Sequence, residues 1–201
     1  MKSKAAVLFS KKKVKVIDVI IPPPEKYQVL VKNIFSSICH TQLGEYLMKR
    51  GKDNYLPHLM GHEGIGEVLD TNRKVKKVNK GDYVLLHWMP SRGINSPVPS
   101  YEWKNKKVNA GNLTTFNTLA VVSENKLTKI SKKQSQNKKV LLLGCTASTA
   151  IGSAKKLTKI NLKDYVAVSG CGSIGLNIIQ YAKYIGVKHI VAVDINDSKL
   201  K

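Results

Sequence analysis

The sequence is poor in features that would each mark a class of protein. Only 3 of its 201 residues are cysteine, an odd number spread over Cys39, Cys145 and Cys171, so a disulfide framework is not expected. No segment approaches the roughly 18 consecutive apolar residues of a membrane span. The basic N-terminus shows no cleavage pattern of a secretory signal. We therefore predict a cytoplasmic protein that has no membrane partner.

Acidic residues are also scarce. The chain carries 13 Asp and Glu against 34 Lys and Arg, a formal net charge of +21. Such an excess can mark a nucleic-acid surface. Most of the lysine groups, however, lie beside Asn, Ser or Gly, where turns are expected, and lysine greatly outnumbers arginine, the better bidentate phosphate ligand. The charge thus indicates solvated turns, and no nucleic-acid partner is predicted, although the positive field would help to attract an anionic cofactor.

Two patterns of apolar residues divide the chain. Through about residue 130, short runs rich in Val, Ile and Leu predict a compact β-barrel or sandwich-like unit. Its predicted strands cover residues 14–19, 28–35, 64–70 and 83–88, and its helix covers 41–49. The later elements are a helical segment at 148–157, a strand at 163–169, a helix at 174–185 and a strand at 189–193. A strand, a turn, a helix and a second strand in this order predict a βαβ unit.

A metal site is suggested by two local motifs and one distant cysteine. A catalytic zinc needs about three protein ligands and one open position, and Cys39, His62 and Cys145 provide two thiolates and an imidazole. Glu63 could enter as an alternative or transient fourth ligand. Each residue alone has a plainer interpretation, since an isolated cysteine is usually a small buried apolar residue and an isolated histidine is usually only hydrogen-bonded. The spacings are also too wide for a zinc finger.

The order and separation of the three motifs change this assessment. Residues 37–41, 61–68 and 143–145 resemble successive motifs of the zinc-dependent medium-chain alcohol dehydrogenases, and the resemblance covers essentially the whole chain. It implies a GroES-like β-barrel catalytic domain over residues 1–146. A connecting helix and the start of an α/β Rossmann NAD-binding domain would follow over residues 147–201. It also implies a catalytic zinc and hydride transfer between a small alcohol or aldehyde substrate and NAD.

The same resemblance assigns roles beside the zinc. The hydroxyl of Thr41 would bond the substrate oxygen and pass its proton outward, and His40 would lie near the cofactor and join that relay. The plainer interpretations are a helix N-cap for Thr41 and an exposed turn residue for His40. Both interpretations of Thr41 can hold together.

One family feature is missing from this sequence. Many relatives hold a second, structural zinc with four closely spaced cysteines, but no cysteine lies between Cys39 and Cys145. We therefore predict one zinc ion and no structural zinc. The lobe at residues 91–112 is expected to be ordered by packing instead, through Trp88, Tyr101 and Trp103.

A glycine-rich turn follows the predicted strand at 163–169. Its G-x-G-x-x-G glycines are Gly170 for the tight turn, Gly172 for the approach of a pyrophosphate and Gly175 for close helix packing. The helix N-terminus offers unpaired N–H groups to phosphate. Asp194, 19 residues beyond Gly175, would bond the adenosine ribose and favour NAD over NADP. The resemblance adds Lys199 at this ribose, while Cys171 between the glycines is interpreted as a packing residue.

Few residues follow Asp194, whereas a Rossmann domain has about six strands. We interpret the sequence as truncated before that domain is complete and before the dimerising region of the homo-oligomers typical of the family. One alternative is an inactive zinc-binding fragment or a partner subunit of a split dehydrogenase. A charge-driven nucleic-acid-binding module is another, which the ordered motifs disfavour. The motifs do not separate simple alcohols, polyols and glutathione adducts.

Overall fold

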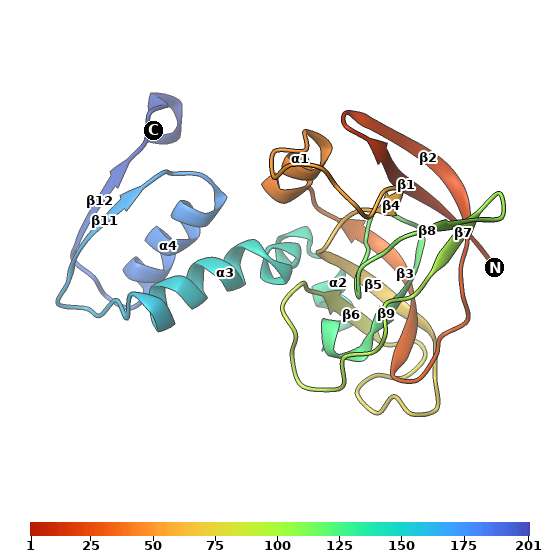
Figure 1. Ribbon diagram of the computed structural model, residues 1–201. Coiled ribbons are helices and arrows are strands. Elements are labelled where there is room, and N and C mark those ends of the chain that lie inside the picture. Colours follow the sequence, from red (N-terminus) through yellow and green to blue (C-terminus); the bar gives the residue numbers. More distant parts are fainter. The chain divides into compact units, whose positions relative to one another are not determined.

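The computed structural model describes all 201 residues, which divide into two compact units, Met1–Gly144 and Cys145–Lys201. The first unit is built mainly from strands, and its helices are short (Figure 1). The second unit alternates helices and strands. No helix in the structure has both the length and the apolar character needed to cross a membrane.

Two five-stranded sheets form the first unit, and all their strand pairs are antiparallel. The first sheet has the order β4 (His58–Leu59), β1 (Lys2–Ser10), β2 (Lys13–Ile20), β7 (Tyr101–Trp103) and β8 (Lys106–Val108). The second has the order β10 (Leu127–Ile130), β6 (Tyr83–Leu86), β5 (Gly64–Thr71), β3 (Gln28–Ser36) and β9 (Leu119–Ser123). The segment before β9 links them, because Ala6 N–H donates to the carbonyl of Phe116 and Thr118 N–H to that of Lys4. The result is a nearly closed, barrel-like structure.

Strand β3 shows how the sequence fills this barrel. Alternate side chains of a strand point to opposite faces. Accordingly, Val29 and Val31 lie in one buried cluster with Val68, while Leu30 lies in a second cluster with Val7. These residues are buried on both faces, which explains the nearly continuous apolar run at the start of the strand.

Hydrogen bonds hold much of the segment between β6 and β7. The hydroxyl of Ser123, which is fully buried, accepts from Ser96 N–H at 2.9 Å and donates to the carbonyl of Ile94 at 3.1 Å. Glu124 accepts from Ile94 N–H at 2.9 Å through Oε1. The predicted ordering by packing is therefore only part of the explanation.

The three aromatic residues expected to order residues 91–112 differ in how far they are buried. Tyr101 lies in the core, and Trp103 packs edge-on against Phe9 with the ring centroids 5.3 Å apart. Trp88 is 44% exposed, so its predicted packing role is wrong. The chain instead anchors its backbone there, because Lys126 Nζ donates to the carbonyl of Trp88 at 2.6 Å.

The remaining elements of the first unit are short helices: α1 (His40–Tyr46), η1 (Glu124–Lys126), α2 (Lys132–Ser135) and η2 (Lys138–Gly144). The second unit contains α3 (Thr146–Gly152), η3 (Ser153–Leu157), β11 (Tyr165–Ser169), α4 (Ser173–Tyr184), β12 (His189–Val193) and η4 (Asp197–Lys199). Strands β11 and β12 pair in parallel, and α4 connects them. The structure therefore contains a βαβ unit.

Candidate metal centre and cofactor turn

Three residues far apart in the sequence bring potential metal ligands together. The ligand atoms of Cys39, His62 and Cys145 all lie within 4.8 Å of one another, and each residue is half-buried. In a tetrahedral zinc site with bonds of about 2.0–2.3 Å, the ligand atoms are about 3.3–3.8 Å apart. Small side-chain movements would thus suffice to close the three ligands around one ion. Two thiols, one imidazole and an open fourth position fit zinc.

Each ligand is placed by a different local structure. Cys39 is the N-cap of α1 and has an extended backbone, and His62 lies in the connection between β4 and β5. Cys145 is attached directly to Gly144, the last residue of the first unit. A Cβ atom at Gly144 would lie 2.7 Å from the carbonyl oxygen of Leu86 and 2.8 Å from Cβ of Glu63, so only glycine allows this approach.

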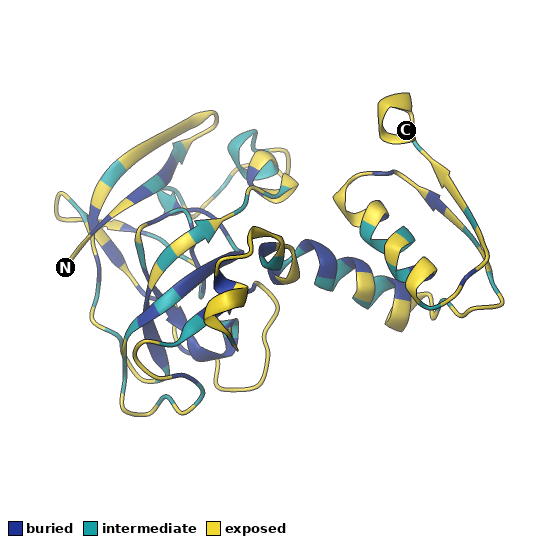
Figure 2. Cartoon of the chain, turned by 180° about the vertical axis from the view of Figure 1, so that it is seen from behind, coloured by how far each residue is buried: buried dark blue, intermediate teal, exposed yellow.

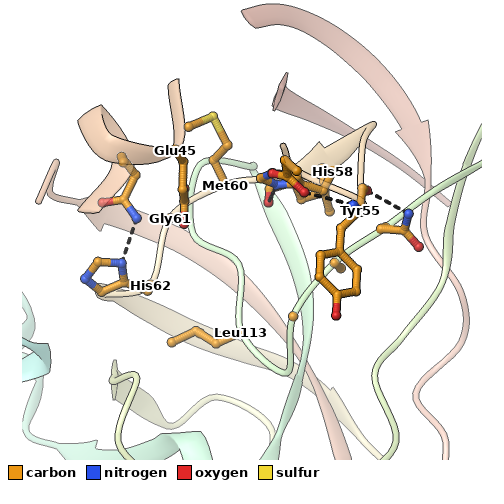
Figure 3. Close-up of a pocket in the computed structure, with 13 residues that line it drawn as sticks. Glu45, Tyr55, His58, Met60, Gly61, His62 and Leu113 are labelled. Atoms are coloured by element: carbon orange, nitrogen blue, oxygen red, sulfur yellow. Dashed lines mark hydrogen bonds and ion pairs between the residues drawn. The ribbon is translucent and has the colours of Figure 1, made fainter. Parts of the chain in front are cut away.

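Gln42 joins two of these ligands and was not predicted as a site residue. Its side chain is 4% exposed; Oε1 accepts from the N–H of Cys39 at 3.1 Å, and Nε2 lies 2.7 Å from Nδ1 of His62 (Figure 3). The contact occupies Nδ1, so Nε2 is the nitrogen of His62 left for a metal. A glutamine three residues after an N-cap is the sequence signal of a capping box, which could have drawn attention to Gln42.

Burial also favours the neutral form of the imidazole. It lowers the pKa of His62, because a charged ring is less stable away from water. A metal binds the unprotonated nitrogen. The environment of His62 therefore suits a ligand at neutral pH.

Glu63 does not belong to the group of close ligand atoms. It is 2% exposed, and its Oε2 is buried without a hydrogen-bond partner. Burial raises the pKa of the Glu63 carboxyl, and the neighbouring Ser37 hydroxyl partly opposes this effect. A nearby cation would satisfy the unpartnered oxygen. A role of Glu63 as a fourth ligand stays a prediction.

The two predicted relay residues open α1. His40 and Thr41 are exposed, and Oγ1 of Thr41 lies 3.9 Å from Sγ of Cys39. The helix begins at His40 and its N-cap is Cys39, so the interpretation of Thr41 as the N-cap is wrong. An exposed hydroxyl next to a ligand sulfur remains compatible with the predicted contact to a substrate.

A cavity of about 310 Å³ lies beside His62 and contains polar groups that the sequence analysis did not single out (Figure 3). Asp53 accepts from Tyr55 N–H at 2.8 Å, and its other carboxylate oxygen lies 2.9 Å from Nε2 of His58. Glu45 also lines the cavity, and burial raises the pKa of its carboxyl, with His58 opposing. No lysine or arginine is among the lining residues, although the chain is strongly basic.

The glycine-rich turn of the second unit lets α4 begin close to the end of β11. A Cβ atom at Gly175 would lie 1.9 Å from the carbonyl oxygen of Gly170, so the helix can approach the turn only with glycine there. A Cβ atom at Gly172 would meet no atom within 4 Å, which leaves space in front of α4. The N-cap residue of α4 is Gly172, which has no side chain that could cap the first N–H groups of the helix.

Asp194 ties the end of β12 to this turn. Its Oδ1 accepts from the N–H of Asn196 at 2.9 Å, and its Oδ2 accepts from that of Cys171 at 2.7 Å. These bonds, together with Lys199 Nζ at 3.6 Å, keep the pKa of Asp194 below its usual value. The ionised carboxylate has further lone pairs, so contacts within the turn and to a ribose can coexist. Cys171 is 2% exposed, in keeping with a packing residue.

Comparison with known proteins gives consistent matches. Residues 25–132 match the alcohol dehydrogenase GroES-like domain. The whole chain is 30% identical to an S-(hydroxymethyl)glutathione dehydrogenase from Escherichia coli O1:K1 / APEC and covers 61% of that protein. The chain thus spans less than two thirds of the curated relatives it matches.

Solved structures agree with the predicted barrel. An alcohol dehydrogenase zinc-binding domain protein from Burkholderia ambifaria matches with a TM-score of 0.88 and 22% identity, over 100% of this chain and 60% of its own. Benzyl alcohol dehydrogenase from Acinetobacter calcoaceticus matches with a TM-score of 0.84 and 26% identity, over the same shares. The GroES-like fold predicted for the first unit is confirmed.

Proposed function

From the premise that this chain belongs to the zinc-dependent medium-chain alcohol dehydrogenases with a GroES-like domain, we propose that it takes part in hydride transfer between an alcohol and NAD. The observation that carries the proposal is the convergence of Cys39, His62 and Cys145. Glutathione adducts and benzyl alcohol are named for relatives, and the alcohol class is the substrate proposed for this chain. A cytoplasmic location and assembly into homo-oligomers stay predictions.

The chain's own residues account for most of the chemistry. A zinc ion at the three ligands would supply a Lewis acid that favours loss of the alcohol proton. Thr41, beside the sulfur of Cys39, would take up that proton at its hydroxyl oxygen while releasing its own hydroxyl proton, and His40 would help to pass the released proton to solvent, since both residues are exposed. Gly170, Gly172 and the start of α4 would hold the pyrophosphate of NAD.

Metal analysis tests the proposed zinc site. We expect about one zinc per purified chain, with most of it lost in Cys39→Ser and Cys145→Ser, because each change removes one of three ligands. Cys171→Ser is the matched control, since this cysteine lies in the glycine turn and outside the cluster. Circular dichroism would verify folding. Freshly purified protein without zinc, or equal zinc in all three variants, would contradict the proposal.

Cofactor titration tests the proposed NAD site. We expect NAD to bind more tightly than NADP, and Asp194→Asn to reduce this preference about tenfold, because the variant lacks the negative charge that repels a 2′-phosphate. The ratio of the two affinities is the informative quantity, since loosening of the turn would weaken both cofactors alike. Asp197→Asn in η4 is the control. An unchanged ratio would refute this role of Asp194.

Zinc binding without NAD binding would favour the alternative of a zinc-binding fragment or partner subunit. NAD binding together with zinc binding would instead favour the dehydrogenase.

A further inference from the structure

The buried amide of Gln42 lies between two of the proposed zinc ligands. It accepts from the backbone N–H of Cys39 through Oε1 at 3.1 Å and faces Nδ1 of His62 through Nε2 at 2.7 Å. The side chain is 4% exposed, so water does not readily replace either contact. Both interactions must therefore be satisfied by the orientation of one amide group.

The contact to Cys39 decides that orientation. A backbone N–H is a donor only, so it requires the carbonyl oxygen of the amide. The NH₂ group of Gln42 then faces His62 and is itself a donor only. Consequently Nδ1 of His62 must accept, and in the neutral ring the proton lies on Nε2.

This tautomer conflicts with metal binding. A ligating histidine presents an unprotonated nitrogen to the metal and normally donates its other N–H to an acceptor. For His62 that arrangement requires the proton on Nδ1 and an oxygen opposite it. If the amide of Gln42 turned to supply the oxygen, its NH₂ group would face the N–H of Cys39, and two donors would meet.

We propose that Gln42 is a positioning residue that holds His62 in the Nε2–H tautomer and thereby weakens metal binding at Cys39, His62 and Cys145. The part concerning affinity rests on the proposed zinc site. The part concerning the tautomer does not, because it follows from the two contacts of the Gln42 amide alone. Binding of a metal at Nε2 would require the ring proton to lie on Nδ1, and Gln42 would then lose one of its two contacts.

Glutamate at this position removes the conflict. A carboxylate is an acceptor at both oxygens, so Gln42→Glu can accept from Cys39 N–H and from Nδ1–H of His62 together. The chain offers a matched control in Gln134, which occupies the same position of α2. There Oε1 accepts from the N–H of the N-cap Ser131 at 2.8 Å, and neither the helix nor its N-cap residue contains a ligand. Gln134→Glu makes the same chemical change at a helix start without a metal ligand beside it.

The first experiment reads the tautomer directly in the metal-free, full-length chain. Long-range ¹H–¹⁵N spectra of the imidazole rings distinguish Nδ1–H from Nε2–H, and loss of one signal set in His62→Gln assigns His62 among the five histidines. We expect Nε2–H in the wild-type chain and in Gln134→Glu, and Nδ1–H in Gln42→Glu. An Nδ1–H tautomer in the wild type overturns the inference, whether or not the protein binds zinc.

The second experiment measures zinc affinity by competition with a chromophoric chelator. We expect Gln42→Glu to bind zinc about 10- to 100-fold more tightly than the wild type, the range over which partners of metal-bound histidines act, and Gln134→Glu to match the wild type. Equal affinity of Gln42→Glu and the wild type, with the tautomers as expected, overturns the link between tautomer and affinity. If neither the wild type nor either variant binds zinc, the proposed zinc site is refuted. The result on the tautomer would still stand.

Discussion

Tyr101 shows what a single polar atom contributes inside the barrel. The side chain is 1% exposed, and its phenol oxygen accepts from the backbone N–H of Val121 at 2.8 Å. Burial raises the pKa of Tyr101 to about 12, and the bond from Val121 only partly opposes this. The first sheet is thus joined to β9 of the second by a hydroxyl that must stay protonated.

We expect Tyr101→Phe to lower the free energy of unfolding by about 1–3 kcal/mol near neutral pH, because the N–H of Val121 loses its acceptor inside the core. The difference from the wild type should narrow at alkaline pH. Since the folded pKa is raised, the unfolded chain loses the proton first, and the wild type loses stability as the pH rises from 10 to about 12. Urea unfolding at several pH values measures both effects.

The control for this prediction is Tyr55→Phe, since Tyr55 is 73% exposed. Lysine side chains lose their protons at alkaline pH in both variants alike. Only Tyr101→Phe removes a buried hydrogen-bond acceptor. A difference between Tyr101→Phe and the wild type that stayed constant through alkaline pH would show that the phenol does not titrate as its burial requires.

Residue type alone left Cys39, His62 and Cys145 with plainer interpretations, and it was the resemblance of the motifs around them to those of a known family that selected them. The same reasoning did not find Gln42. Gln42 matters because its amide oxygen faces the N–H of Cys39 and its amide nitrogen faces His62. This arrangement arises only where α1 packs beside the segment that precedes β5. For Glu63 the sequence gives only a suitable residue type beside a ligand; its carboxylate lies outside the group of close ligand atoms, and its role as an alternative or transient ligand stays a prediction.

At the level of elements, strands with several consecutive or alternating apolar residues were predicted well, and β1 and the three-residue strands were not. Strand β3 and strand β12 lie where the sequence places them. Strand β1 was missed, because it opens with the exposed lysines Lys2 and Lys4 and so resembles a polar N-terminal segment, although Ala5 and Val7 that follow are buried. Strands β7 and β8 have three residues each, and such strands form through their distant partners more than through their own composition.

Helix α1 ends three residues before the predicted end for a local reason. Its C-cap is Leu47, and Met48 has a positive φ of 49°, which stops the helix. Strand β6 likewise ends at Leu86, because His87 leaves the strand and its ring contacts the carbonyl of Met89 and the hydroxyl of Thr128. Side-chain contacts of this kind set boundaries that apolar periodicity cannot predict.

Across the whole chain, burial differs between the two units, each considered separately (Figure 2). The first unit contains all three clusters of buried apolar residues. In the second, isolated side chains such as Val168, Ala182 and Val187 are buried while much of β12 is exposed. The barrel positions Cys39 and His62 on a well-packed support, whereas the glycine turn of the second unit relies on hydrogen bonds such as those of Asp194.

The chain has a net charge of +21, and few of its charged side chains form ion pairs. There are four, of which Lys4–Asp18 is largely exposed and Lys129–Asp82 is the shortest, at 2.6 Å. Burial disfavours the ionised form of Asp82, but Lys129 and the N–H of Asn79 outweigh it and keep the pKa of Asp82 below its usual value. Exposed pairs contribute about 0–1 kcal/mol each, so repulsion among the lysines should dominate the electrostatics of the fold.

We therefore expect the melting temperature to rise with sodium chloride, because screening lengths fall from about 30 Å at 0.01 M to about 10 Å at 0.1 M and weaken the repulsion. The variant Lys11→Glu with Lys13→Glu changes two exposed residues at the turn between β1 and β2 and lowers the net charge by 4. It should melt higher at low salt and respond less to added salt. The control Lys11→Arg with Lys13→Arg keeps the charge and should follow the wild type. A melting temperature that falls with salt would show that the four ion pairs, and not the excess of lysine, govern the electrostatic stability of this chain.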